Sequence, residues 1–427
     1  MKFVFYDLET TGRNSTWDQI IQVGAILVDE QFNEIERFEE RCKLRPGIVP
    51  EPGALIVNNT SLDMLNNVNL SHYDLIKKIQ YLFKKWSPAI FIGYNTINFD
   101  EEFLRKTFFK LLFEPYITQF NGNKRADVLG ITRTSKFYYP DSLQVGLNEK
   151  GNQVFKLDNL TRLNNIVHNA HDAMGDVEAT IHMARLIKSR APDVWERMIT
   201  LSFKQNVLDL LRAEPVLCYQ TGFPGGKPNY AFVTECGFDP TYDNSRAVFE
   251  LSQDPKPFLD LDEEQLTQEF GKTGSPLKKV RANAQPILMP LSSAPQGLRD
   301  LAPTLPTIEE RALLIAESEP FRRRVGTALS KLYQDVEPSN HVEKQIYDGF
   351  PSNSDSARMR QFHIAPWEDR MDLVRQMQDQ RFARIGQRLI YYEKPDLLSD
   401  PTKEKIRNDF SSYEEIFPDR PPLSVML

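Results

Sequence analysis

The sequence predicts an α/β layer fold followed by two smaller domains. The first 190 residues alternate β-rich runs with amphipathic helices, a β-rich region follows a change in composition near residues 191–195, and the last third is helical. A length of 427 residues, at about 150 residues per domain, also suggests about three domains. We therefore divide the chain into residues 1–190, 191–338 and 339–427.

Strands and helices are interleaved within residues 1–190. Short β-rich runs predict strands at 2–7, 20–28, 32–43 and 89–93. Apolar residues at helical spacing predict helices at 75–86, 99–113 and 176–187. This order predicts a mixed sheet flanked by helices.

The rest of the chain reads as a small β-domain and a helical module. Residues 215–250 contain β-rich pieces separated by a glycine and proline turn. The run QPILMPL within the proline-rich segment 281–306 fits an edge strand or an extended connection, but not a central strand. Helical patterns cover 309–335 and 355–394, and we expect the final PDRPPLSVML to be a loose tail.

The composition indicates a folded, water-soluble protein. Hydrophobic residues make up 41% and charged residues 26%, which argues against disorder, collagen and coiled coil. Because the chain has neither an apolar run of membrane-spanning length nor a signal peptide, we expect a cytoplasmic protein without membrane contact. The three cysteines, none in a C-x-x-C pair, are expected to be buried thiols: Cys42, Cys218 and Cys236.

The net charge of 52 − 59 = −7 does not exclude a nucleic-acid substrate. Proteins that bind nucleic acid by bulk attraction are normally basic. An enzyme that holds metal ions with carboxylates, however, adds local negative charge that hides a basic path elsewhere on its surface.

Two acidic residues lie two positions apart at the end of the first predicted strand. Period-two alternation directs the carboxylates of Asp7 and Glu9 to the same face of the sheet. Such a pair repels itself unless a cation or a proton compensates, so a metal site is one interpretation. A solvated strand end is the other.

Two further segments carry acids in suggestive positions. Asn95 ends a predicted strand in GYNTINFDEEFLR and Asp100 opens the next helix, while His171 precedes Asp176 in NAHDAMGDVEATIHMARLI. Each acid taken alone is equally consistent with a helix cap. His168, three residues before His171, is a weak candidate for a zinc pair because no cysteine lies nearby.

Together the three segments, D-x-E, N-x-x-x-F-D and H-x-x-x-x-D, resemble the DEDDh exonuclease superfamily, which has a ribonuclease-H-like fold. The resemblance implies that two metal ions are held by four acids: Asp7, Glu9, Asp100 and Asp176. By analogy, Asp7 would bridge both ions, Glu9 and Asp176 would complete the site that activates water, and Asp100 would support the second ion. His171 would be the general base, since an imidazole accepts a proton near neutral pH.

The chemistry explains why carboxylates are needed. Phosphodiester hydrolysis requires an activated water and relief of charge on the phosphate, and two divalent ions about 4 Å apart serve both ends of the displacement. Mg²⁺ prefers hard oxygen ligands, so we expect two Mg²⁺ ions, with Mn²⁺ as a substitute.

Segments without catalytic duty resemble the bacterial exodeoxyribonuclease I family, among them KLDNLTRLNNI, RANAQPILM and QIYDGFPSNSD. The resemblance covers essentially the whole chain. It implies an SH3-like middle domain, a helical C-terminal domain, removal of mononucleotides from single-stranded DNA in the 3′ to 5′ direction, and action in DNA repair and recombination. It also implies contact with the C-terminal tail of single-strand DNA-binding protein, and we expect a monomer. The helical third is shorter than is usual for this family.

Candidate substrate contacts are basic or aromatic residues and polar groups beside the acidic motifs. A single-strand groove combines cations with aromatic platforms. The candidates are Thr10, Asn95, Arg133, Lys136 and Tyr138. For the segment TRTSKFYYP, a loop whose aromatics pack into the core is an equally good interpretation.

Three alternatives remain open. An RNA-trimming DEDDh nuclease would share the mechanism but leave the two additional domains unexplained. A catalytically silent scaffold would be expected to have lost at least one of the five catalytic groups, and this chain keeps all five. A carbohydrate hydrolase needs only two carboxylates, and it is disfavoured because four acids without the signal of an aromatic-rich cleft indicate metal binding instead.

Overall fold

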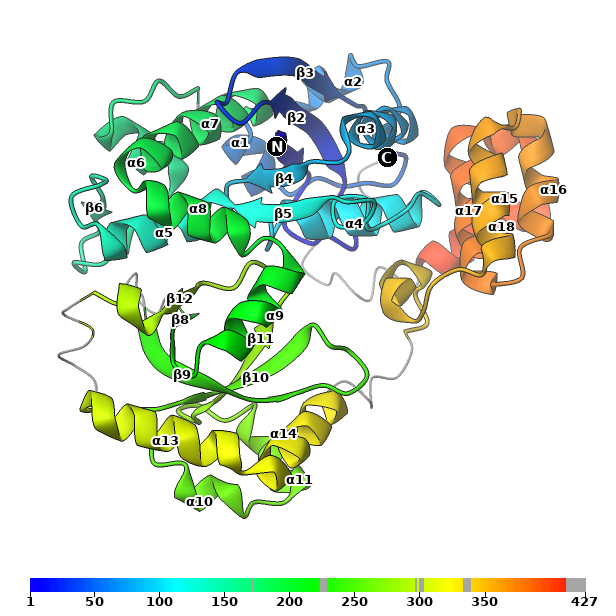
Figure 1. The fold of residues 1–427 in the computed structure, drawn as a ribbon. Helices are drawn as coiled ribbons and strands as arrows, with labels where there is room; N and C mark the ends of the chain where they lie inside the picture. Colours follow the sequence, from blue (N-terminus) through cyan, green and yellow to red (C-terminus); the bar gives the residue numbers. More distant parts are fainter. Residues whose placement is uncertain (170–171, 223–228, 296–297, 299–302, 333–338, 412–427) are drawn as a thin grey trace.

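The computed structural model describes residues 1–169, 172–222, 229–295, 298, 303–332 and 339–411 (Figure 1). Figure 1 shows two sheet-containing layers, one above the other, with a bundle of helices beside the upper layer. No helix in these ranges has the length and apolar character needed to cross a membrane.

The first sheet is mixed and has five strands. Strand β1 pairs antiparallel with β2 and parallel with β4, and β4 pairs parallel with β5. Since every residue of β2 is buried, this strand is covered on both faces. The sheet order is β3 (Glu34–Arg41), β2 (Ile20–Val28), β1 (Phe3–Thr10), β4 (Ile90–Gly93) and β5 (Lys124–Asp127).

Helices cover both faces of this sheet and divide its side chains into two cores. Phe3 and Phe5 of β1 belong to the core that includes α7, whereas Val4, Tyr6 and Leu8 belong to the core that includes α3 and α4. A small ribbon pairs β6 (Gly146–Leu147) with β7 (Gln153–Val154). The helices are α1 (Pro52–Val57), α2 (Leu62–Asn66), α3 (His72–Trp86), α4 (Asp100–Lys110), α5 (Val128–Tyr138), α6 (Leu157–Leu163), α7 (Ala173–Arg190) and α8 (Pro192–Thr200).

The second sheet is antiparallel throughout, and helices α13 and α14 pack on it. Its order is β11 (Leu277–Arg281), β10 (Ser245–Glu250), β9 (Asn229–Phe238), β8 (Leu217–Gly222) and β12 (Leu288–Pro290). Its helices are α9 (Lys204–Ala213), α10 (Lys256–Leu259), α11 (Glu263–Glu269), η2 (Leu291–Ser293), α13 (Leu305–Glu317) and α14 (Glu319–Lys331).

The helical module docks against the first layer and shares its second core. The ring of His363 stacks on Phe113 with centroids 3.8 Å apart, and its Nδ1 lies 2.8 Å from the hydroxyl of Tyr73. The elements of the module are η3 (Val342–Tyr347), α15 (Asn353–Ile364), η4 (Trp367–Asp369), α16 (Arg370–Arg375), α17 (Gln380–Glu393), η5 (Pro395–Leu397) and α18 (Asp400–Ser411).

The fold class predicted from sequence is confirmed, with local differences. Strand β1 runs to Thr10 rather than ending at residue 7, so the two acids lie inside the strand. The segment TRTSKFYYP lies largely in helix α5, not in a loop. Strand β12 is an edge strand, as the proline within it requires, and the three cysteines are buried. The domain boundaries after residues 190 and 338 stay predictions.

Candidate active site

Strand β1 directs two carboxylates toward helix α7. Asp7 and Glu9 continue the alternation of Phe3 and Phe5, whose side chains lie in the core that α7 covers. Glu9 is 8% exposed. The sequence pattern thus places both acids on one face, beneath the start of α7.

A close approach of α7 to the sheet adds the third acid. Gly24 of β2 lies directly opposite Asp7, and a Cβ atom at Gly24 would meet the backbone carbon of Ala173 at 2.7 Å. The missing side chain therefore lets the first turn of α7 lie against the strand. As a result, ligand oxygens of Asp7, Glu9 and Asp176 all lie within 4.8 Å of one another.

Asp100 reaches the same strand from the opposite core. It is the first residue of α4 and is 3% exposed. Its Oδ1 accepts a hydrogen bond from the backbone N–H of Leu8 at 3.1 Å, between the two acids of β1. The structure therefore brings together all four predicted acids, although Asp100 lies outside the tight group of three.

The electrostatics of the cluster show uncompensated negative charge. Burial raises the pKa of Asp7 well above its usual range, and the charges of Asp100, Asp176 and Glu9 raise it further. Burial, then the charges of Asp176 and Asp172, raise the pKa of Glu9 to about 8. Burial also raises the pKa of Asp100. A set of hard oxygen donors that repel one another suits a divalent cation.

Of the two histidines that precede Asp176, the structure describes only His168. His171, which the sequence predicts as the general base, lies outside the described residues. His168, which sequence reasoning set aside, has its Nε2 at 2.5 Å from Oδ1 of Asp176. Its only sequence signal was its place in the same loop as His171.

The five candidate substrate contacts are dispersed. Thr10 is buried and donates its hydroxyl hydrogen to the carbonyl of Gly12, and Lys136 donates to the carbonyl of Leu143. Tyr138 is half-buried and packs against the core that contains Tyr230 of β9. Asn95 is exposed at the end of β4.

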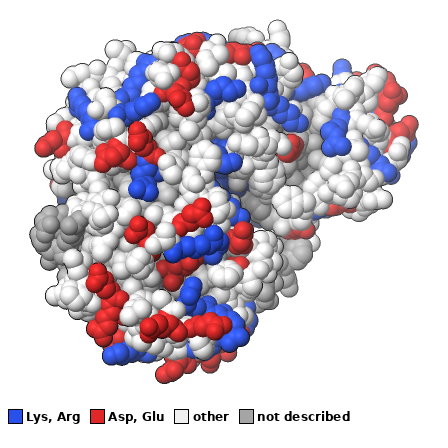
Figure 2. Space-filling view, in the orientation of Figure 1, with Lys and Arg blue, Asp and Glu red and all other residues white. Residues whose placement is uncertain are grey.

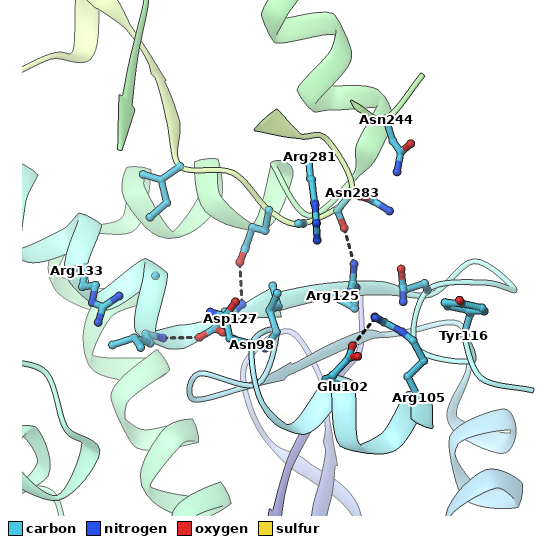
Figure 3. A pocket seen from close by; sticks show the side chains of 17 residues that line it. Asn98, Glu102, Arg105, Tyr116, Arg125, Asp127, Arg133, Asn244, Arg281 and Asn283 are labelled. Carbon is cyan, nitrogen blue, oxygen red and sulfur yellow. Dashed lines mark hydrogen bonds and ion pairs between the residues drawn. The ribbon is translucent and has the colours of Figure 1, made fainter. Parts of the chain in front are cut away.

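The fifth candidate, Arg133, lines a cavity of about 580 Å³ between the two layers. Figure 3 shows Arg281 and Asn283 reaching from the second sheet toward Arg125 and Arg105 of the first layer. Asn283 joins the layers by accepting a hydrogen bond from Arg125 at its carbonyl, at 2.8 Å.

The charge of this cavity is slightly positive. Arginines 105, 125, 133 and 281 line it, together with Glu102 and Asp127. The buried Glu101 lies 3.8 Å from Arg105 and 3.7 Å from Arg125, so four guanidinium groups face three carboxylates. The guanidinium of Arg281 has no hydrogen bond or ion pair within the described part of the chain. Figure 2 shows basic and acidic side chains interspersed on the visible face, so the positive charge is local.

Aromatic residues border this cavity. We call Tyr116, Phe120, Tyr347 and Phe350 the aromatic rim. The ring of Tyr116 lies 5.5 Å from that of Phe120 and 5.7 Å from that of Phe350, and Arg105 lies over Tyr116 at 5.4 Å. Phe350 is 72% exposed. Arg105 follows Asp100 by five residues on α4, which is about 7.5 Å along the helix axis.

Comparisons with known proteins agree with this architecture. Residues 4–184 match the family model described as Exonuclease, and residues 202–331 match the model described as Exonuclease I SH3-like domain. Exodeoxyribonuclease I of Escherichia coli K12 is 29% identical over 373 residues, which are 84% of this chain and 78% of that protein.

Two solved structures extend the likeness to the whole chain. E. coli exonuclease I in complex with a dA16 oligonucleotide is 26% identical, with a TM-score of 0.86 over 97% of this chain and 91% of that one. A structure described as SSB/exonuclease I with an inhibitor is 24% identical, with a TM-score of 0.83 over 98% and 95% of the two chains. With an exonuclease domain and an SH3-like domain in this order, the chain is similar to exodeoxyribonuclease I proteins over most of its length.

Proposed function

We propose that this protein hydrolyses single-stranded DNA from its 3′ end and releases 5′-mononucleotides. The observation that carries the proposal is the convergence of Asp7, Glu9 and Asp176, with Asp100 beside them, in a chain that is similar to exodeoxyribonuclease I. We assign these four carboxylates to holding two divalent ions, Mg²⁺ in the cell. Such ions, when bound, neutralise charge on the phosphate and lower the pKa of water.

The chain's own side chains assist the hydrolysis of the phosphodiester bond. Water adds to phosphorus, the P–O3′ bond breaks, and the terminal nucleotide leaves as a 5′-mononucleotide, while O3′ of the shortened strand takes up a proton and becomes the new 3′-hydroxyl. We assign His171 as the base that takes the proton from the attacking water. The buried position of Asp100 and Glu9 keeps bulk water away from the acids, which strengthens their hold on cations.

The cavity and the aromatic rim support a single-stranded substrate. Every base has a face that can stack on an aromatic ring, and phosphates can bind guanidinium groups. The exposed rings of Phe120 and Phe350 supply surfaces for stacking, and Arg281 supplies a guanidinium group for a phosphate. Because paired bases are already stacked in a duplex, a rim of this kind favours unpaired strands.

The test is cleavage of single-stranded DNA labelled at its 5′ end. With Mg²⁺ we expect a ladder that shortens from the 3′ end, and with EDTA we expect none. Asp176→Asn should abolish the ladder, whereas Glu178→Gln, an exposed acid on the same helix, should keep it. Faster trimming of RNA than of DNA would overturn the substrate, and DNA binding without cleavage would favour the silent scaffold.

A second prediction concerns the aromatic rim. We expect Tyr116→Ala and Phe350→Ala each to weaken binding of a single-stranded oligonucleotide by about 1–3 kcal/mol, because each removes a stacking face. Fluorescence anisotropy in EDTA measures affinity without cleavage. Tyr81→Ala, which removes an exposed ring on α3, is the control. Affinities equal to that control would exclude the rim from the DNA path.

We also propose the acidic C-terminal tail of single-strand DNA-binding protein as a partner. Support comes from the related exonuclease I whose structure was solved under the description SSB/exonuclease I. Titration of a fluorescent tail peptide against this protein tests the proposal.

A further inference from the structure

Helix α6 is linked to the acid cluster through His168. Its Nδ1 lies 3.1 Å from the hydroxyl oxygen of Thr161 on α6, a hydroxyl that also donates to the carbonyl of Asp158 at 3.0 Å. Its Nε2 lies 2.5 Å from Oδ1 of Asp176 on α7. The side chain of His168 is 6% exposed and Thr161 is 1% exposed. The imidazole is therefore held at both nitrogens, in a place that solvent barely reaches.

The backbone around His168 is packed as closely as its ring. A Cβ atom at Gly175 would meet the carbonyl oxygen of Asn169 at 2.1 Å, so the loop lies directly on the first turn of α7. Beyond the loop, Asp172 caps this helix and accepts a hydrogen bond from Gln22 of β2 at 2.9 Å. Loop, helix and sheet thus fix the distance between His168 and Asp176.

Oδ2 of Asp176 remains available for other ligands beside this contact. Oδ1 faces His168, while Oδ2 has no hydrogen bond within the described residues. A carboxylate that binds a metal needs its plane fixed, and hydrogen bonds from neighbouring side chains fix it.

We propose that His168 is a positioning residue, which orients Asp176 for cation binding through a relay from Thr161. The inference rests on the proposed function, because it assigns a task at the same site. His168 acts through Asp176 and is distinct from the general base, a role that we assign to His171.

The test measures Mn²⁺ affinity directly, by electron paramagnetic resonance of the free ion, in the full-length protein without DNA. We expect His168→Ala to weaken Mn²⁺ binding about 10- to 100-fold. His168→Gln, which keeps an N–H donor, should recover most of that loss. Thr161→Val removes the hydroxyl at nearly constant volume and should weaken binding by a smaller factor. His182→Ala, an exposed histidine on α7, is the control.

The outcomes separate this proposal from the function on which it rests. Failure of the wild type to bind Mn²⁺ or to cleave DNA would contradict the proposed function itself. Tight Mn²⁺ binding by the wild type, with His168→Ala within twofold of it, would overturn only the role of His168, and so would a glutamine variant as weak as alanine. Should the alanine variant not fold, as thermal unfolding would reveal, Thr161→Val decides: affinity equal to wild type overturns the relay.

Discussion

Replacement of Asp7 by asparagine is expected to lower kcat on the order of 10³-fold or more, and at the same time to stabilise the metal-free protein by about 1–3 kcal/mol. The two effects have one cause. Burial and the neighbouring charges of Asp100, Asp176 and Glu9 oppose ionisation of Asp7, as the raised pKa of its carboxyl shows. Because asparagine cannot ionise, it removes this destabilisation together with the central ligand.

Divalent ions should reverse the order of stability. A ligand that binds only the folded state adds stability that grows with its concentration, about 2.7 kcal/mol at 100 times Kd. The wild type should gain this stability in Mg²⁺, whereas Asp7→Asn should gain little. Thermal unfolding of the wild type and of Asp7→Asn, each in EDTA and in Mg²⁺, measures the four stabilities. The initial rate of nucleotide release measures the loss of activity. Glu178→Gln is the matched control. A variant less stable than wild type in both buffers would show that Asp7 has a structural role instead.

The acid cluster was predictable because its pattern is local. Alternation within one strand places Asp7 and Glu9 on the same face without knowledge of any other segment. Asp176 was harder to interpret, since a cap at a helix start explains such an acid equally well. In the structure Asp172 is the cap, and α7 begins at Ala173, so Asp176 lies one turn inside the helix. Its carboxylate is therefore free to face the strand.

The cavity and the aromatic rim could not be predicted because they join distant segments. Tyr116 follows α4, whereas Phe350 follows η3, and the sequence gives no sign that their rings lie 5.7 Å apart. Arg281 belongs to an edge strand of the second sheet and faces the first layer. The role of His168 could not be predicted for a related reason. Its contact with Thr161 forms only because α6 packs beside α7, which the sequence does not show.

The contact of His363 with the first layer should make the stability of the protein sensitive to acid. The ring of His363 is saturated as a neutral imidazole: Tyr73 donates its hydroxyl hydrogen to Nδ1, and Nε2–H donates to the carbonyl of Leu112 at 3.1 Å. A second proton on the ring would occupy Nδ1 and would break the hydrogen bond from Tyr73. Burial, and then the charges of Arg370 and Lys77, lower the pKa of His363 to about 4.

We therefore expect His363 to contribute stability above pH 6.5 that is lost as pH falls toward 4. Throughout this window the unfolded chain, with a histidine pKa near 6.5, binds more protons than the folded protein, so the free energy of unfolding falls by up to about 3 kcal/mol. Because glutamine cannot titrate, the free energy of unfolding of His363→Gln should fall less on acidification than that of the wild type. At pH 7.5 this variant should be less stable than the wild type by about 1 kcal/mol, because it loses the stacking on Phe113. Urea unfolding from pH 4.5 to 7.5 measures both curves, and their difference removes the contributions of the acid cluster. His182→Gln should run parallel to wild type. If His363→Gln ran parallel as well, the acid sensitivity would have to reside in another group, such as the buried His72, whose pKa burial also lowers.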